Sequence, residues 1–223
     1  MTKELVTSND TGPSQLANAA PTRAAGLERL NNFASTGLKS YTERRNYDYG
    51  PEDRSNISAL SPWVRRRLIS EQEIIEKLFK TYSHGTAEKY IQQVIWRTYF
   101  KGWLEQHPTV WTAYHEGVMT GLHELSCNQS KAILHEKAIT GQTGIDCFDS
   151  WATELMEHSY LHNHARLWFA SIWIFTLKLP WELGANFFMK YLLDGDPASN
   201  TLSWRWVAGL HTKGKNYLAV SDN

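Results

Sequence analysis

Apolar residues recur at helical spacing along most of the chain, and the alternating pattern typical of strands is almost absent. Leu27, Leu30 and Phe33 lie on one face of a short predicted helix. Residues 37–67 then lose this periodicity at glycine and proline breakers. Residues 1–25 are polar and carry no periodic apolar positions, so we expect a flexible tail there.

Helical signals dominate after residue 70. Ser70, followed three residues later by Glu73, has the capping-box pattern that starts a helix. Further helical signals are the stripe Ile91, Val94, Ile95 and Thr98, a helix from Pro108 through Leu122, segments 151–160, 163–178 and 181–193, and an N-cap at Asp196-Pro197. The pattern therefore predicts an all-α fold, with one helical domain over residues 26–223.

The ten tryptophans are unusual for a chain of 223 residues. Their flat rings suit either a planar cofactor or an aromatic-rich core. The 23 basic and 23 acidic residues balance to a formal charge of zero, which argues against non-specific DNA coating. A local basic face is still compatible with this balance, and Arg65 to Arg67 are a candidate for one.

Two features of the sequence favour a cytoplasmic protein. Cys127 and Cys147 lack the spacing of a zinc or iron–sulfur motif, which favours a reducing compartment and no metal site. The start of the chain has no apolar signal-peptide core, and the longest apolar run, residues 167–177, is shorter than the ~20 residues of a membrane span. We therefore expect a cytoplasmic protein without a membrane partner.

The turn Asp194-Gly195-Asp196 is the leading candidate for chemistry. Its carboxylates could bind a metal, act as an acid–base pair or cap a helix, and capping alone explains Asp196. Arg166 precedes the turn by one predicted helix, and Asn200 follows it by one helical turn. In His162-Asn163-His164, neighbouring residues of a helix do not share a face, so we expect no metal chelate.

The stretch from residue 162 to 209 resembles the flavin-binding core of the photolyase/cryptochrome family. It combines an aromatic-rich helix, the Asp-Gly-Asp turn and Trp204-Arg205-Trp206 after Asn200. The resemblance implies FAD as the cofactor, with Arg166 and Asp194 paired beside the flavin ring and Asp196 at its polar edge. Asn200 would face the ring nitrogen N5, and asparagine there is typical of repair photolyases.

Two earlier segments extend the resemblance. The segment 58–62, Ser-Ala-Leu-Ser-Pro, resembles the loop that holds the FAD diphosphate, and residues 93–100 resemble the family's Trp-Arg-Glu-Phe helix. The implied FAD contacts are Tyr41, Ser58, Leu60, Ser61, Arg97, Asn163, Arg166, Asp194, Asp196 and Asn200. The implied contacts to damaged DNA are Arg45, Gln93, Trp96, Asn163 and His164, and a core position is the alternative for Trp96.

The family's electron relay is matched in part. Trp204 and Trp181 correspond to its proximal and middle tryptophans, and the outer position falls near Asn128. Trp151, Trp168 and Trp173 are candidates to replace the outer member.

The resemblance implies a blue-light enzyme that repairs pyrimidine dimers in DNA by electron transfer from reduced flavin. Gln93 and Leu167 stand where cyclobutane-dimer enzymes usually have Glu and Met, so the lesion stays open. The alternatives are a cryptochrome-type photoreceptor and a flavin-free helical interaction protein. We also expect no antenna domain before the helical domain, and a C-terminus shorter than the family's usual one.

Overall fold

The computed structural model describes residues 19–212 and 214–220. Within them the chain is helical and contains no strand, which confirms the all-α prediction. The helices are α1 (Arg23–Ser35), α2 (Tyr41–Arg44), α3 (Ser61–Arg65), α4 (Glu71–Thr81), α5 (His84–Gln106), α6 (Pro108–Cys127), α7 (Gln129–Thr140), α8 (Asp146–His158), α9 (Asn163–Ser171), α10 (Trp181–Tyr191) and α11 (Pro197–Val207), with the short segments η2 (Leu38–Ser40) and η3 (Ile172–Thr176).

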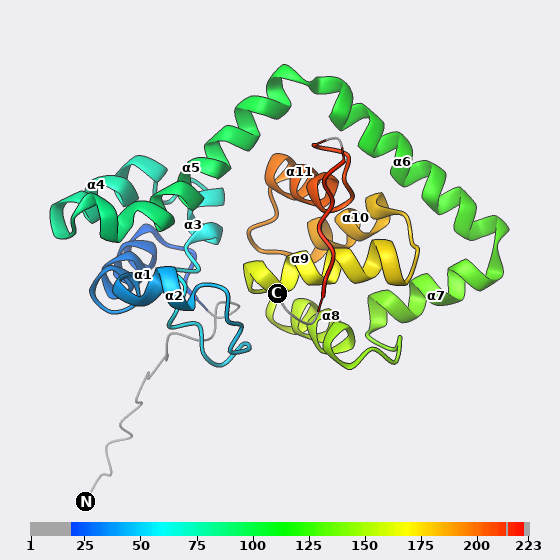
Figure 1. Ribbon diagram of the computed structural model, residues 1–223, viewed down its shortest axis with the longest axis horizontal. Helices are drawn as coiled ribbons and strands as arrows, with labels where there is room; N and C mark the ends of the chain where they lie inside the picture. The colour runs from blue at the N-terminus through cyan, green and yellow to red at the C-terminus, as the bar shows by residue number, and fades with distance from the viewer. Residues whose placement is uncertain (1–18, 213, 221–223) are drawn as a thin grey trace, which may run out of the picture.

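The helices form two lobes. Helices α1 to α4 make the first lobe, α8 to α11 make most of the second, and α5, α6 and α7 run as an arch from one to the other (Figure 1). Each lobe has its own apolar core. The first is built around Leu30, Trp63 and Leu78, and the second around Phe169 and Trp173.

The predicted helix starts are confirmed where a capping side chain marks them. Ser70 and Glu73 make both hydrogen bonds of a capping box at the start of α4. Asp196 accepts a hydrogen bond from the Ser199 amide at 3.0 Å and caps α11. Pro108 stands in the first turn of α6, where its missing N–H leaves no hydrogen bond unmade.

Several boundaries differ from the predicted ones. Helix α1 begins at Arg23, inside the segment predicted as tail, because the Thr22 hydroxyl accepts a hydrogen bond from the Ala25 amide. The rest of that tail, residues 1–18, lies outside the described residues. The segment predicted as one helix over 163–178 is α-helical to Ser171 and continues through η3 with π-type hydrogen bonds.

Helix α5 does not present its predicted apolar stripe to one core. Ile91 is buried and Val94 is half-buried, but Ile95 is 52% exposed. The reason is that α5 leaves the first lobe partway along its 23 residues and enters the arch.

A close helix crossing sets the position of Trp204. The Trp204 ring from α11 lies directly on Gly184 of α10, so that a Cβ atom at Gly184 would overlap the ring. The ring also makes edge-to-face contacts with Phe188, at 5.1 Å, and Trp173, at 6.2 Å between centroids. Trp204 is consequently 2% exposed and fixed from three sides.

We predict that Gly184→Ala destabilises the protein by about 1–3 kcal/mol, because the added methyl group forces a well-packed ring to move. Gly102→Ala is the matched control: Gly102 is also helical, has open space around its Cβ position, and should gain up to about 1 kcal/mol. Urea unfolding measures both variants. Equal stability of the two would contradict the packing described here.

Candidate functional site

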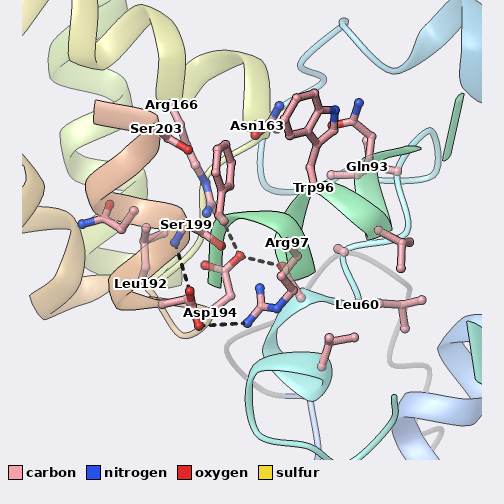
Figure 2. Close-up of a pocket in the computed structure, with 18 of the residues that line it drawn as sticks. Leu60, Gln93, Trp96, Arg97, Asn163, Arg166, Leu192, Asp194, Ser199 and Ser203 are labelled. Atoms are coloured by element: carbon pink, nitrogen blue, oxygen red, sulfur yellow. Dashed lines mark hydrogen bonds and ion pairs between the residues drawn. The ribbon is translucent and has the colours of Figure 1, made fainter. Parts of the chain in front are cut away.

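A cavity of about 290 Å³ lies where the two lobes meet (Figure 2). Its wall combines Tyr41 and Leu60 of the first core with Phe188 and Trp204 of the second. The predicted site residues in the wall are Tyr41, Ser58, Leu60, Ser61, Gln93, Trp96, Arg97, Asn163, Arg166, Asp194, Asp196, Asn200 and Trp204. Arg45, His164 and Trp181 are outside this wall.

Asp194 is the carboxylate that joins the lobes. Its Oδ2 atom accepts hydrogen bonds from Arg166 Nη2 at 3.0 Å and from the Ser61 hydroxyl at 2.5 Å. Burial alone would raise the pKa of Asp194, but the Arg166 guanidinium and these hydrogen bonds outweigh it, so the pKa lies below its usual value. Asp194 is therefore ionised at neutral pH, and its pairing with Arg166 agrees with the predicted arrangement.

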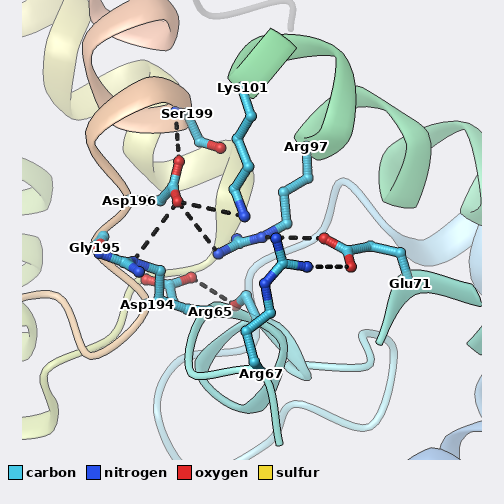
Figure 3. Close-up of polar contacts among 10 residues, drawn as sticks. Arg65, Arg67, Glu71, Arg97, Lys101, Asp194, Gly195, Asp196 and Ser199 are labelled. Atoms are coloured by element: carbon cyan, nitrogen blue, oxygen red, sulfur yellow. Dashed lines mark hydrogen bonds and ion pairs between the residues drawn. The ribbon is translucent and has the colours of Figure 1, made fainter. Parts of the chain in front are cut away.

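Asp196 faces a group of cations (Figure 3). One of its oxygens caps α11, and the other, Oδ2, lies 3.7 Å from Arg65 Nε, 3.7 Å from Arg97 Nη2 and 3.8 Å from Lys101 Nζ. The capping role considered for Asp196 is thus present. A contact from Asp196 to a flavin ring stays a prediction.

The basic segment 65–67 is divided between the cavity and the surface, where Arg66 is exposed. Arg65 turns inward and donates from Nε to the Gly195 carbonyl at 2.8 Å, while Arg67 pairs with Glu71 at 3.1 Å. Lys101, which is not among the predicted site residues, stands one turn after Arg97 on α5. Its i, i+4 spacing from Arg97 was the signal that could have identified it.

Several polar atoms in the wall are buried without a hydrogen-bond partner. They are Asp194 Oδ1 and Ser199 Oγ, together with Arg97 Nε and Nη2. The two Arg97 atoms lie 3.9 Å from Glu71 Oε1 and 3.7 Å from Asp196 Oδ2, which is ion-pair but not hydrogen-bond distance. Buried polar groups are normally paired. Cationic donors, a free carboxylate oxygen and a hydroxyl together suit a ligand that carries both anionic groups and hydrogen-bond donors. A dinucleotide with phosphates and a heterocyclic ring meets that requirement.

The Ser58–Ser61 segment approaches the cavity on a strained turn. Ala59 has a φ of 45°, in the left-handed region that residues with a side chain rarely adopt. The turn is held in place because Arg29 Nε donates to the Ser58 carbonyl at 2.7 Å. Such strain persists where the surroundings fix it, and it is frequent at ligand sites.

Asn200 and His162 have defined polar roles. Asn200 Nδ2 donates to the Ala185 carbonyl at 2.8 Å, which leaves its Oδ1 atom as an acceptor in the cavity wall. His162 Nδ1 accepts from the His164 amide at 3.1 Å and caps α9. Burial lowers the pKa of His162 to about 4, so the ring is neutral at neutral pH.

The mouth of the cavity is aromatic and exposed. Trp96 is 50% exposed, so its alternative assignment as a core residue is wrong. Gln93 and Asn163 are also exposed and belong to the same wall. Flat and amide side chains together can stack on a planar ring and bind its polar edge.

A row of aromatic contacts leads away from Trp181. Its ring lies 5.8 Å from that of Tyr114, and Tyr114 lies 5.2 Å from half-buried Trp111. Of the three tryptophans considered as outer members, Trp173 contacts Trp204, whereas the rings of Trp151 and Trp168 contact each other at 6.4 Å between centroids. Sequence alone could not identify Trp111, because it is far from Trp181 along the chain.

No helix in the described part of the chain is long and apolar enough to cross a membrane.

Known proteins are similar to this chain in sequence. The chain is 26% identical to a deoxyribodipyrimidine photo-lyase of Escherichia coli over 203 residues, which are 88% of this chain and 41% of that protein. A photo-lyase of Streptomyces griseus is 30% identical over 172 residues, 74% of this chain and 35% of that protein. The chain thus spans about two-fifths of the length of such relatives.

Two crystal structures share the fold. A class III photolyase from Agrobacterium tumefaciens superposes with a TM-score of 0.72 at 24% identity, over 96% of this chain and 43% of that one. A Synechocystis cryptochrome superposes with a TM-score of 0.74 at 23% identity, over 90% and 41%.

The model of the FAD-binding domain of DNA photolyase matches residues 90–222, which is more than half of the chain and includes Arg97, Arg166, Asp194 and Asn200. The lobe-spanning cavity, with its paired Arg166 and Asp194 and its buried polar atoms that lack a hydrogen bond, fits the FAD for which this domain is named. The chain therefore belongs to the photolyase family, as an FAD-binding domain.

Proposed function

We propose that this protein repairs pyrimidine dimers in DNA, in blue light and with reduced FAD. The main support for this proposal is a single cavity. Its interior is charged at Arg166 and Asp194, and its mouth is aromatic and exposed at Trp96. The interior suits a flavin, and the mouth suits a base turned out of its helix. When bound, FAD supplies light-driven one-electron transfer.

Different residues of the chain have different roles in the proposed reaction. Arg97 and Lys101, with the Ser58–Ser61 turn, bind the diphosphate. Arg166 places a cation beside the ring, which favours added negative charge there. Asn200 Oδ1 accepts a hydrogen bond from a ring N–H, and Asp194 keeps Arg166 in place. Trp96 stacks against the dimer while Gln93 and Asn163 bind its polar edge.

The proposal is tested with the purified, flavin-loaded protein and an oligonucleotide that contains a cyclobutane dimer. Blue light with a thiol reductant should restore the intact pyrimidines, and the same mixture kept dark is the control. Flavin absorption without repair would support the cryptochrome-type alternative. A protein that binds no flavin would support the flavin-free interaction protein.

Asp194→Ala should lower the free energy of unfolding by up to about 3 kcal/mol, because it leaves the partly buried Arg166 charge unpaired. It should also lose flavin on gel filtration. Asp146→Ala, which removes an exposed carboxylate at the start of α8, is the control and should change stability by less than about 0.5 kcal/mol.

The same pair predicts a pH dependence. Because the pKa of Asp194 is lowered in the folded protein, its stabilisation is present above the unfolded value, about 3.9, and is lost as the pH falls through the folded value. The difference in stability between wild type and Asp194→Ala should therefore shrink below about pH 4. A constant difference down to pH 3 would contradict an ionised Asp194.

Photoreduction should depend on Trp204 and Trp181. We propose that Trp111 is the outer donor, reached through Tyr114, and that an external thiol returns the electron that passes inward. Trp181→Phe and Trp111→Phe should each slow photoreduction at least tenfold without loss of flavin, since volume and apolarity are nearly kept. Trp63→Phe, in the core of the first lobe, is the control. An unchanged rate in Trp111→Phe would assign the outer step elsewhere.

Arg45 should contact a DNA phosphate, as the resemblance to photolyases implies for this residue, which is half-buried one turn after Tyr41. The affinity for dimer-containing DNA should fall with salt, and Arg45→Ala should reduce the log–log slope by about one. Arg67→Ala is the control, because Arg67 is paired with Glu71. Fluorescence anisotropy at several salt concentrations measures both slopes.

A further inference from the structure

Glu182 is a carboxylate to which the proposed repair function gives no role. It stands in the first turn of α10, directly after Trp181, and it is half-buried. It is not part of the cavity wall, so the cofactor does not account for it. Removing a carboxylate from water is costly, and the surroundings of Glu182 therefore need an explanation.

The Glu182 side chain lies against the backbone of α6. A Cβ atom at Gly117 of that helix would come within 2.6 Å of Glu182 Cγ and 2.7 Å of Glu182 Oε1. The carboxylate occupies this place only because residue 117 has no side chain. One turn later, a Cβ atom at Gly121 would lie 3.0 Å from Leu183 Cγ. Helix α6 therefore packs closely on the first turn of α10 and fixes the carboxylate there.

This place is next to the proposed electron relay. The Trp181 and Tyr114 ring centroids are 5.8 Å apart, and Tyr114 precedes Gly117 by one turn of α6. Glu182 accepts a hydrogen bond from the Trp181 side chain. Burial, and after it the charge of Glu182, raises the pKa of Tyr114 to about 12. One negative charge thus acts on two neighbouring rings of the relay.

The charge of Glu182 is only partly offset. Within the described residues, the titratable groups that act on it are Tyr114 of α6 and Arg205 of α11. Arg205 also donates from Nη2 to the Leu210 carbonyl at 3.3 Å. Burial raises the pKa of Glu182 above its usual value, although the Glu182 amide, Arg205 and Trp181 oppose this shift. Glu182 therefore changes charge at a higher pH than an exposed glutamate.

We propose that Glu182 stabilises the positive charge that Trp181 carries during photoreduction, as a positioning residue of the relay. This inference rests on the proposed photoreduction through Trp181. When Trp181 gives one electron towards Trp204, its indole keeps its proton and becomes a cation. An electron from the Tyr114 side then restores the ring, and the external thiol replaces that electron. A carboxylate beside the ring attracts the cation more strongly where water is partly excluded.

The first test measures the rate of light-driven flavin reduction by the full chain with a thiol reductant, from about pH 5 to pH 8. Glu182→Gln keeps the shape of the side chain and removes its charge. It should slow reduction by about 3- to 10-fold at neutral pH, the size of one charge interaction in a partly exposed place. In the wild type the rate should fall as the pH falls through the raised pKa of Glu182, because the protonated group no longer attracts the cation. Glu182→Gln should lack this step.

Two further variants separate charge from packing. Glu116→Gln is the matched control, since Glu116 is exposed on α6 directly before Gly117, and it should keep the wild-type rate and pH profile. Gly117→Ala keeps the charge but displaces it, because the added methyl group meets the end of the flexible Glu182 side chain. Its rate should fall as in Glu182→Gln. Circular dichroism and flavin absorption show that each variant is folded and loaded.

The contact itself is tested without flavin, by proton–nitrogen NMR. The indole N–H signal that Trp181→Phe removes should shift with pH in the wild type but not in Glu182→Gln, and the absence of this difference would overturn the inference. An unchanged photoreduction rate in Glu182→Gln, when Trp181→Phe slows it, would also overturn the inference and leave the relay intact. An unchanged rate in Trp181→Phe, or a wild type without flavin, would reject the relay together with the inference.

Discussion

The ion pair between Arg166 and Asp194 is the interaction on which the rest of the site depends. It is the place where α9, the turn before α11 and the start of α3 are bound to one another, because Ser61 donates to the same carboxylate oxygen. A buried pair of this kind adds little stability by itself, since both charges lose water. Its value lies in geometry: it fixes a cation at the floor of the cavity and leaves one carboxylate oxygen, Oδ1, free for a ligand.

The second group of charges works differently. Around Asp196, three cations share one carboxylate at distances of 3.7–3.8 Å, longer than direct hydrogen bonds. Burial lowers the pKa of Arg97, although Asp196 and Asp194 oppose this shift. Arg97 also lies 3.9 Å from Glu71, so Arg65, Arg97 and Lys101 face two carboxylates, and positive charge exceeds negative charge on this side of the cavity. An anionic ligand would relieve that excess, whereas the Arg166 side is already balanced.

Much of the fold and the composition of the site could be predicted from sequence. Caps at Ser70 and Asp196 are local, so four residues are enough to recognise them. The grouping of Arg97, Arg166 and Asp194 was accessible only through the family resemblance, since their convergence depends on packing between distant helices. The sequence could not show which way several side chains point. Ile95 and Trp96 face solvent because α5 leaves the first lobe for the arch. Arg65 points inward because it donates a hydrogen bond to the Gly195 carbonyl.

The bond between Ser61 and Asp194 also has a consequence for how the protein is made. It closes a loop of 133 residues, and the neighbouring bond from Arg65 to Gly195 closes one of 130. Contacts between residues so far apart in sequence form late in folding, because closing a long loop costs conformational entropy before the contact can stabilise the fold. During synthesis the first lobe can assemble as soon as it leaves the ribosome, but its half of the cavity has no counterpart until Asp194 has emerged. The complete cavity wall is thereby available only to chains that have been translated beyond Asp194.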